Sequence, residues 1–158
     1  IFLVNSSMIL FLNTWNRVIP KWSYVLLYSS SNVWWDHFLN TLILSFIGTP
    51  IPPEKSFFYK DIEPLLEKLP IETLIRAKAN LYIRREKIVH HKDHVDTKFP
   101  HKGAIYYLND NDGLTVLEDG TEIESRANRV LLFDPSKPHH STSCTSDKRR
   151  VNININYL

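Results

Sequence analysis

Cysteine is almost absent from this chain, which contains only Cys144. A single cysteine excludes an internal disulfide framework and is typical of a protein from a reducing compartment. Long apolar runs are missing too, because no stretch reaches the roughly 18 to 20 uninterrupted apolar residues that span a bilayer. The first residue is Ile1 rather than Met, as expected of a fragment or a processed product. We therefore expect a soluble, cytoplasmic protein without a membrane segment.

Concentrated charge is also missing. The chain has 19 basic and 17 acidic residues and a formal net charge of +2. Its only run of three basic residues is 148–150, whereas a nucleic-acid-binding surface needs a concentrated basic stripe. There is no Gly-rich phosphate loop, no Ser nucleophile elbow and no pair of cysteines suited to zinc. Nucleic acid is therefore a disfavoured partner, and phosphate-loop and serine-hydrolase chemistry are disfavoured activities.

Length and composition favour one globular domain over residues 1–158, with 43% hydrophobic and 23% charged residues. Residues 1–56 hold all four tryptophans and follow neither a period of 2 nor one of 3.6. We interpret residues 1–73 as an N-terminal region that covers one face of a sheet. The alternative is that some of its aromatic side chains line a substrate groove. Three prolines predict a stiff loop at 49–53.

A short helix is predicted over residues 61–69. Asp61 is a suitable N-cap, and Pro64 falls in the first turn, where its missing N–H costs nothing. Apolar residues then recur at helical spacing, and Pro70 ends the run. The apolar stripe predicts packing against a sheet; its members are Ile62, Leu65, Leu66 and Leu69.

The pattern changes to a period of 2 from Leu74, which predicts a strand with one apolar and one polar face. Asp119-Gly120 predicts a hairpin turn, and residues 109–113 have turn composition. Further short strands are predicted at 94–96, 103–109, 114–117, 121–125, 130–133 and 151–158. The fold class is therefore mainly β with flanking helices, as in an antiparallel jelly roll.

The most informative chemical pattern is His94-Val95-Asp96. Residues i and i+2 of a strand point to the same face, so His94 and Asp96 can bind one ion between them. A second histidine, His139, follows the predicted strand 130–133 and a proline-bounded turn. Two histidines and one carboxylate form the facial triad of non-haem Fe(II) oxygenases, which leaves roughly three of six coordination positions open.

Further features accompany the triad: Phe133-Asp134-Pro135-Ser136 before His139, an arginine pair after it, and Tyr106-Tyr107-Leu108-Asn109 between the metal ligands. Over residues 74–158 the sequence resembles the 2-oxoglutarate/Fe(II)-dependent oxygenases, and among them the prolyl-4-hydroxylase-like branch.

This resemblance implies a double-stranded β-helix, a cupin-like jelly roll, as the catalytic core at 74–158. It also implies Fe(II) and O₂, with 2-oxoglutarate as co-substrate and ascorbate as a further candidate cofactor. The implied reaction couples oxidative decarboxylation of 2-oxoglutarate to succinate and CO₂ with hydroxylation of a substrate. The substrate is an unidentified protein, peptide or small molecule, and a prolyl residue is one candidate.

Other histidines could compete for the metal. A histidine in a polar loop is usually solvated, and His90, His91 and His101 have no carboxylate partner on a shared strand face. Between His139 and His140, the family pattern Phe-Asp-x-Ser-x-x-His selects His139. The predicted catalytic and metal-binding residues are therefore His94, Asp96 and His139.

The resemblance implies that an arginine binds the distal carboxylate of 2-oxoglutarate, since arginine is a permanently charged fork. Spacing allows Arg149 or Arg150. Arg150 shares a strand face with three asparagines, whereas Arg149 shares one with Val151 and Ile153, so a polar cavity favours Arg150.

The resemblance also gives Tyr107 a hydrogen bond to the same carboxylate. Tyr82 and Asn80 join the candidate co-substrate site on strand parity alone. Relatives often carry Gly-Gly-x-Thr where this chain has a single glycine, Gly113, before Thr115. Two other functions remain open: a non-catalytic jelly-roll module that binds a metal, and an oxygenase that acts on nucleic acid.

Overall fold

The computed structural model describes residues 2–4, 7–11, 43–44, 54–55 and 59–158. The predictions made for the side chains of residues 1–56, including the aromatic groove, the proline-rich loop and this part of the covering region, lie outside the described residues. Within it, no helix has both the length and the apolar character that crossing a bilayer requires.

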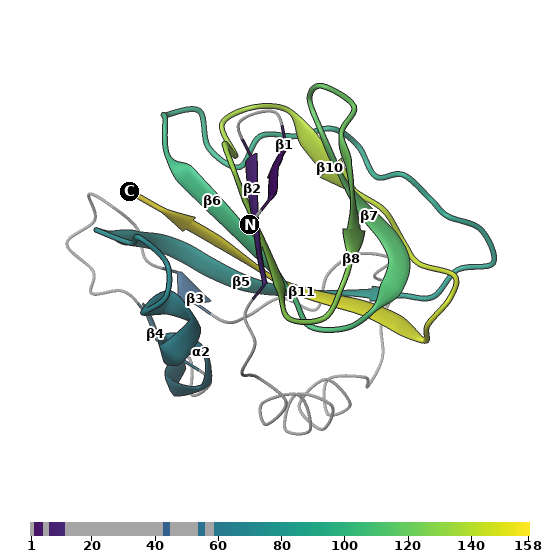
Figure 1. Ribbon diagram of the computed structural model, residues 1–158, viewed down its shortest axis with the longest axis horizontal. Coiled ribbons are helices and arrows are strands. Elements are labelled where there is room, and N and C mark those ends of the chain that lie inside the picture. Colours follow the sequence, from purple (N-terminus) through teal and green to yellow (C-terminus); the bar gives the residue numbers. More distant parts are fainter. Residues whose placement is uncertain (1, 5–6, 12–42, 45–53, 56–58) are drawn as a thin grey trace.

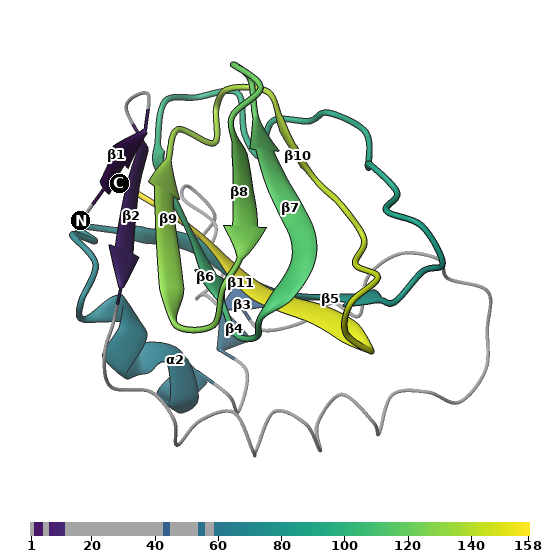
Figure 2. The same cartoon turned by 45° about the vertical axis from the view of Figure 1, so that its right-hand side comes forward.

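Two β-sheets form the body of the molecule (Figures 1 and 2). The larger has eight strands in the order β1-β2-β9-β6-β11-β5-β3-β4, and every neighbouring pair is antiparallel. Its strands are β1 (Phe2–Val4), β2 (Ser7–Phe11), β3 (Ile43–Leu44), β4 (Glu54–Lys55), β5 (Leu74–Ile83), β6 (Lys102–Tyr107), β9 (Arg129–Phe133) and β11 (Arg149–Tyr157).

The smaller sheet has the order β10-β7-β8 and faces the larger one (Figure 2). Its strands are β7 (Asn111–Leu117), β8 (Glu122–Ser125) and β10 (His139–Ser141). The irregular segment 89–96 runs antiparallel to β10 and extends this sheet, through isolated bridges from His90 to Thr142 and from His94 to His139. Two facing antiparallel sheets make the predicted jelly roll, and the mainly β fold class is confirmed.

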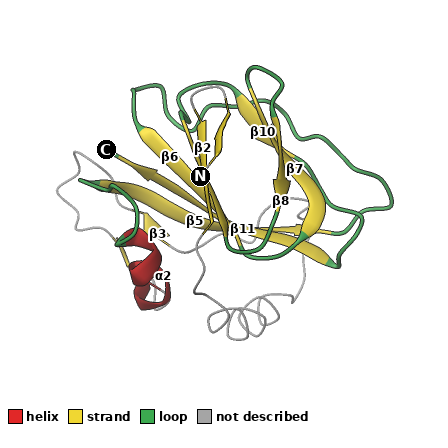
Figure 3. Cartoon of the chain, viewed as in Figure 1, coloured by secondary structure: helices red, strands yellow, loops and turns green. Residues whose placement is uncertain are grey.

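The outer face of the large sheet packs against helix α2 (Tyr59–Leu66), which is drawn in red in Figure 3. The helix begins two residues earlier and ends three residues earlier than the predicted 61–69. Ile62, Leu65, Leu66 and the following Leu69 are all buried. They join a core that contains Ala77, Ala104, Tyr106, Val130, Val151, Ile153 and Ile155.

The inner face of the large sheet is divided into an apolar and a polar part. Near β6, β8 and β9 it is filled by a second apolar cluster of Ile105, Tyr107, Ile123, Leu131 and Phe133. Along β5 and β11 it is polar, because the residues that alternate with the outer apolar face are arginine, asparagine, lysine and tyrosine. This polar half of the sheet is where a ligand can be held.

Two local predictions are wrong, and one strand was not predicted. Segment 94–96 is not a strand, because His94 is its only residue in a β-bridge, which pairs it with His139. The predicted turn at 109–113 is wrong in its second half, because β7 begins at Asn111. A register shift between Asn111 and Leu114 marks a bulge in the pairing of β7 with β8. Strand β10 is absent from the predicted set, because its three residues are too few to show alternation.

A carboxylate clamp on the β7 bulge fixes the loop that leads into β11. Asp112 accepts hydrogen bonds from the backbone N–H of Thr145 at 2.7 Å and of Ser146 at 3.0 Å, and from both hydroxyl groups. Burial alone would raise the pKa of Asp112, but these hydrogen bonds dominate and lower it from 3.8 to about 2. The ionised carboxylate is therefore stabilised by the folded state.

We expect the α2 contact to contribute strongly to stability. Leu65 is 2% exposed in the core beneath the sheet, so Leu65→Ala leaves a cavity and should cost about 2 to 5 kcal/mol of unfolding free energy. Urea denaturation measures this. Glu63→Ala on the exposed face of the same helix is the control and should change stability by less than about 0.5 kcal/mol.

The Asp112 clamp should make stability depend on pH. Because the pKa of Asp112 is lower in the folded state, its contribution is present above about pH 4 and is lost as the pH falls toward about 2. Asp112→Asn should therefore narrow the difference between unfolding free energies measured at pH 5 and pH 3. Glu118→Gln on the exposed turn after β7 is the control. Equal pH dependence in Asp112→Asn and wild type would contradict the prediction.

Candidate metal centre

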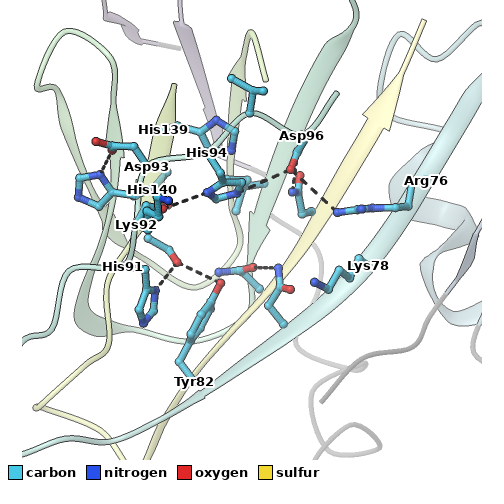
Figure 4. Close-up of a pocket in the computed structure, with 17 residues that line it drawn as sticks. Arg76, Lys78, Tyr82, His91, Lys92, Asp93, His94, Asp96, His139 and His140 are labelled. Carbon is cyan, nitrogen blue, oxygen red and sulfur yellow. Dashed lines mark hydrogen bonds and ion pairs between the residues drawn. The ribbon is translucent and has the colours of Figure 1, made fainter. Parts of the chain in front are cut away.

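His94, Asp96 and His139 lie together at one end of the cavity between the sheets (Figure 4). One ligand atom from each residue lies within 4.8 Å of the others. His94 Nε2 is 3.8 Å from Asp96 Oδ1, and the two imidazole rings have centroids 4.6 Å apart. Within the part of the chain that the structure describes, this is the only group of three His, Cys, Asp or Glu side chains whose ligand atoms lie this close together.

Backbone hydrogen bonds hold these residues in place. His94 and His139 each donate their N–H to the carbonyl of the other at 3.0 Å, and the Asp96 N–H donates to the Pro135 carbonyl at 3.0 Å. Segment 94–96 is therefore attached to β10 and to the turn before it. The side chains of His94 and Asp96 converge although segment 94–96 is not a strand. Its conformation is set by these backbone hydrogen bonds to β10 and to the turn before it.

His139 has the better defined ring orientation of the two histidines. Its Nδ1 lies 2.9 Å from the Lys137 carbonyl, and because a carbonyl only accepts, Nδ1 carries the proton and Nε2 is free to bind a metal. Burial lowers the pKa of His139, which favours the neutral ring. The edge of the Phe133 ring packs against it. The His94 side chain, by contrast, is 52% exposed.

Asp96 is oriented by two asparagine amides from β11. Asn154 and Asn156 both donate from Nδ2 to Asp96 Oδ2, at 3.0 and 2.8 Å, which leaves Oδ1 on the side of His94. Burial alone would raise the pKa of Asp96, but the hydrogen bonds from the two asparagines and the nearby His139 and Arg76 lower it overall. The carboxylate is thus ionised and turned toward the histidines, as in a supported metal ligand.

A further histidine supports this arrangement from behind. His101 is 8% exposed, and its Nε2 lies 2.9 Å from Asn156 Nδ2. Its Nδ1 lies 2.8 Å from the Phe99 carbonyl, so Nδ1 carries the proton and Nε2 accepts from the amide. The expectation that His101 is a solvated loop residue is wrong. No pattern in the sequence indicates this contact, because residues 101 and 156 meet only through sheet pairing.

The neighbouring histidines have other partners. His140 Nδ1 lies 2.6 Å from Asp93 Oδ1, and its Nε2 lies 3.0 Å from His90 Nδ1. His91 Nδ1 lies 2.8 Å from Ser141 Oγ, and its ring stacks on Tyr82. The structure therefore brings His139, and not His140, to His94 and Asp96.

A cavity of about 470 Å³ extends from this cluster of candidate metal ligands between the two sheets. Polar side chains from β5 and β11 form one wall, and segment 91–96 with β10 forms the other (Figure 4). Its lining includes the predicted Asn80 and Tyr82 together with Arg76, Lys78, Thr115, Ser141, Asn152 and Asn154. Asn80 donates to Asn152 Oδ1 at 3.0 Å, and Ser141 donates to the Tyr82 hydroxyl at 3.1 Å.

Arg150 lies behind the far wall of this cavity and is 0% exposed. Its guanidinium donates to Ser125 Oγ at 2.8 Å, to the Thr142 carbonyl at 3.0 Å and to Thr115 Oγ1 at 3.0 Å. The rings of Tyr82 and Tyr107 lie 5.2 and 6.0 Å from its central carbon. Burial lowers the pKa of Arg150, but arginine stays protonated in proteins.

Arg150 is therefore a buried cation with uncharged partners. No salt bridge joins it to a carboxylate among the described residues. A buried charge without a counter-ion is costly, which makes the surroundings of this guanidinium a favourable place for an anion. Arg149, its neighbour, is only partly buried.

Thr115 connects Arg150 to the cavity. The sequence pattern around Gly113 gives no indication of this role. Its Oγ1 accepts from Arg150 at 3.0 Å and from the Tyr107 hydroxyl at 2.8 Å. Burial raises the pKa of Tyr107, so the phenol remains a donor. With two donors on its oxygen, Thr115 can give its own proton to an acceptor in the cavity it lines. Tyr107 itself lies behind Thr115, outside the cavity lining.

Comparison with known proteins gives matches in structure alone. No protein-family model matches the sequence, and no curated protein is similar enough to count as a relative. Among solved structures, a prolyl hydroxylase from Trichoplax adhaerens, in complex with a hypoxia inducible factor peptide fragment, superposes with a TM-score of 0.62 and 15% identity. The match covers 98% of this chain and 84% of that one.

An oxidoreductase of the 2OG-Fe(II) oxygenase family from Burkholderia pseudomallei superposes with a TM-score of 0.54 and 12% identity. This match covers 73% of the present chain and 65% of the Burkholderia chain, so the present chain spans just under two thirds of that protein's length. The resemblance found in the sequence is thus confirmed at the level of the fold, which is that of the 2OG-Fe(II) oxygenases and prolyl hydroxylases.

Divalent metal binding should depend on the three converging residues. Replacing His94, Asp96 or His139 by Ala removes one donor and should lower affinity for Fe(II) or Co(II) at least about tenfold, while the circular dichroism spectrum is retained. His140→Ala is the matched control, because His140 is paired with Asp93 and His90. Loss of binding in His140→Ala but not in His139→Ala, measured by calorimetry, would contradict the assignment.

Proposed function

We propose that this chain is a 2-oxoglutarate- and Fe(II)-dependent dioxygenase that hydroxylates a substrate. The observation that carries the proposal is a His-Asp-His cluster at one end of the cavity and the buried Arg150 behind its far wall, where Thr115 joins the guanidinium to the cavity lining. The cluster has the donor set of a facial iron centre, and the arginine is a cation without a counter-ion in the described part of the chain.

The donor chemistry fits Fe(II). Two imidazole nitrogens and one carboxylate oxygen suit a first-row divalent ion, and a three-residue set leaves coordination positions for co-substrate and oxygen. Asp96 is held by two amides and His139 by the Lys137 carbonyl, which are the outer contacts that fix metal ligands in known sites. When bound, the iron and 2-oxoglutarate supply the oxidising chemistry, with succinate and CO₂ as co-products.

The other end of the cavity fits a carboxylate. Arg150 would supply the positive charge from behind the wall, Thr115 can donate a hydrogen bond from the cavity lining, and Tyr107 keeps Thr115 oriented through its hydroxyl. Tyr82 packs over the guanidinium and lines the cavity. A dicarboxylate with its keto-acid end toward the metal would place its distal carboxylate at this position. These side chains would bind the co-substrate and exclude water. Each would donate a hydrogen bond without transferring its proton.

A bare metal-binding module explains this site less well. Such a protein has no use for a buried, uncompensated arginine at the end of the cavity opposite the metal ligands, since burying a charge destabilises the fold. The small net charge of +2 gives no support to nucleic acid as substrate. A prolyl residue remains a candidate substrate.

Removing the arginine tests the proposal. Arg150→Ala leaves the distal carboxylate without its charged partner, which should cost on the order of 2 to 5 kcal/mol. The dissociation constant for 2-oxoglutarate should therefore rise at least about tenfold, since each 1.4 kcal/mol is one decade. Calorimetry with Mn(II)-loaded protein measures binding without turnover, and affinity for Mn(II) alone should stay within about twofold.

Matched variants make the test specific. Arg150→Lys should restore only part of the affinity, because an ammonium lacks the planar fork. Arg149→Ala, on the neighbouring residue, should change 2-oxoglutarate binding less than about twofold. If wild-type protein with metal binds no 2-oxoglutarate, or if Arg149→Ala is the damaging change, the proposal is wrong. Succinate formation with Fe(II) and ascorbate, over a panel of substrates, then tests catalysis.

A further inference from the structure

We infer that Arg76 binds the keto-acid carboxylate of the co-substrate, and that the metal end of the cavity is thereby a site for 2-oxo acids in its own right. This inference rests on the proposed function and deepens it by adding a binding residue and a wider class of ligand. Arg76 lies on β5 and lines the cavity beside Asp96, as Figure 4 shows. Its neighbours Ile75 and Ala77 are buried on the other face of the strand.

The fold itself engages Arg76 only weakly. Within the described residues its one charged contact is with Asp96, where Nη2 lies 4.0 Å from Oδ1. This distance is too long for a hydrogen bond. The Nε atom of Arg76 is buried and has no hydrogen-bond partner in the same part of the chain. Because the side chain is 32% exposed and lines the cavity, a ligand can reach the guanidinium.

Asp96 does not need Arg76 for its orientation. Asn154 and Asn156 donate to Asp96 Oδ2 at 3.0 and 2.8 Å, which are ordinary hydrogen-bond distances. Asn156 lies directly opposite Arg76 in the pairing of β5 with β11, so the two residues share the inner face of the sheet. The amides therefore hold the carboxylate, and the guanidinium lies beside Oδ1, the oxygen that is left for a metal.

This position brings Arg76 close to any other ligand of an ion on Asp96. Neighbouring oxygen ligands of an octahedral divalent ion lie roughly 3 Å apart, because each bond is about 2.1 Å long. A carboxylate oxygen that binds the ion next to Oδ1 can therefore come within hydrogen-bond distance of a guanidinium 4.0 Å from Oδ1. A carboxylate also matches a guanidinium geometrically, since the two can form parallel hydrogen bonds.

Charge favours an anion at this point. A divalent ion held by Asp96 and two neutral imidazoles keeps one positive charge that its protein ligands do not balance. Arg76 adds another positive charge within a few ångströms, and like charges this close repel each other. A carboxylate that contacts both the ion and Arg76 offsets this repulsion, whereas water or a neutral group does not. The keto-acid end of 2-oxoglutarate supplies such a carboxylate.

The two ends of the cavity then bind different parts of one molecule. Arg76 lies at the end with the candidate metal ligands, and Arg150 lies behind the far wall, where Thr115 joins it to the lining. 2-Oxoglutarate has one carboxylate for each arginine. A 2-oxo acid without the distal carboxylate still has the metal and Arg76 as partners. Small 2-oxo acids would therefore bind this cavity and compete with 2-oxoglutarate.

The test uses two isomers that each keep one carboxylate of 2-oxoglutarate. 2-Oxopentanoate keeps the keto-acid end and has a methyl group in place of the distal carboxylate. 4-Oxopentanoate keeps the distal carboxylate and has a methyl group in place of the keto-acid carboxylate. Binding to Mn(II)-loaded protein is measured by calorimetry without turnover, and by competition with 2-oxoglutarate where binding is weak. Wild-type protein should bind 2-oxopentanoate.

Variants at the two arginines should have opposite effects on the isomers. Arg76→Gln should weaken binding of 2-oxoglutarate and of 2-oxopentanoate at least about tenfold, because a charged partner is lost. Its affinity for 4-oxopentanoate should stay within about twofold. Arg150→Ala should weaken binding of 4-oxopentanoate and leave 2-oxopentanoate within about twofold. Arg76→Lys should retain part of the affinity, since an ammonium keeps the charge but lacks the planar fork.

The affinity for Mn(II) alone separates ligand binding from a purely structural role. If Arg76 only supported the metal centre, Arg76→Gln would weaken Mn(II) binding as well. A cation beside Asp96 instead opposes the ion, so the variant should bind Mn(II) as tightly as wild type or more tightly. Arg84→Gln is the matched control, because Arg84 is exposed just beyond the end of the same strand. It should change none of these affinities.

Three results would overturn the inference. They are a wild-type protein that binds 2-oxoglutarate but not 2-oxopentanoate, unchanged binding of both 2-oxo acids in Arg76→Gln, and a parallel loss of Mn(II) affinity in that variant. The proposed function fails in a different way, because Arg150→Ala would then leave 2-oxoglutarate binding unchanged. Loss of 2-oxopentanoate affinity in Arg76→Gln would still support the role of Arg76 in that case.

Discussion

The buried guanidinium of Arg150 is the constraint on which much of this structure depends. A permanent cation with no exposed surface must be surrounded by acceptors, and here they are two hydroxyls and a backbone carbonyl from β7, β8 and the segment after β10. These elements belong to the smaller sheet and its edge, whereas Arg150 belongs to the larger. One side chain therefore joins the two sheets, and an anion bound beside it would be stabilised by the same charge.

Strand β11 connects the fold to the chemistry. Its outward residues Val151, Ile153 and Ile155 are part of the core under α2, and its inward asparagines support Asp96 and line the cavity. Pleating makes these two roles inseparable, since a slip of one residue would exchange the apolar and polar faces. The packing of the outer core thereby fixes which side chains can reach His94, Asp96 and His139.

Much of this arrangement could be predicted from local pattern. Alternation along 151–156 places Arg150 on the polar face, and helical spacing places the Leu65 stripe against the sheet; both are what the structure shows. The failures concern contacts between residues distant in sequence. His101 meets Asn156 across the sheet, the β7 bulge depends on its pairing with β8, and segment 94–96 is set by its bonds to β10. Neither periodicity nor composition carries that information, and the roles of the site residues remain proposals.

The single glycine before Thr115, Gly113, has a steric role beside Arg150. A Cβ at this position would lie 2.5 Å from Cδ of Arg150, 2.8 Å from the Asn111 side chain and 2.9 Å from the Ser143 carbonyl. The stem of the arginine thus occupies the volume that a side chain at position 113 would need. The two positions form one steric unit, so a sequence that gains a side chain at 113 must also relocate its arginine. Covariation between these positions would distinguish related sequences that keep the proposed anion site from those that have lost it.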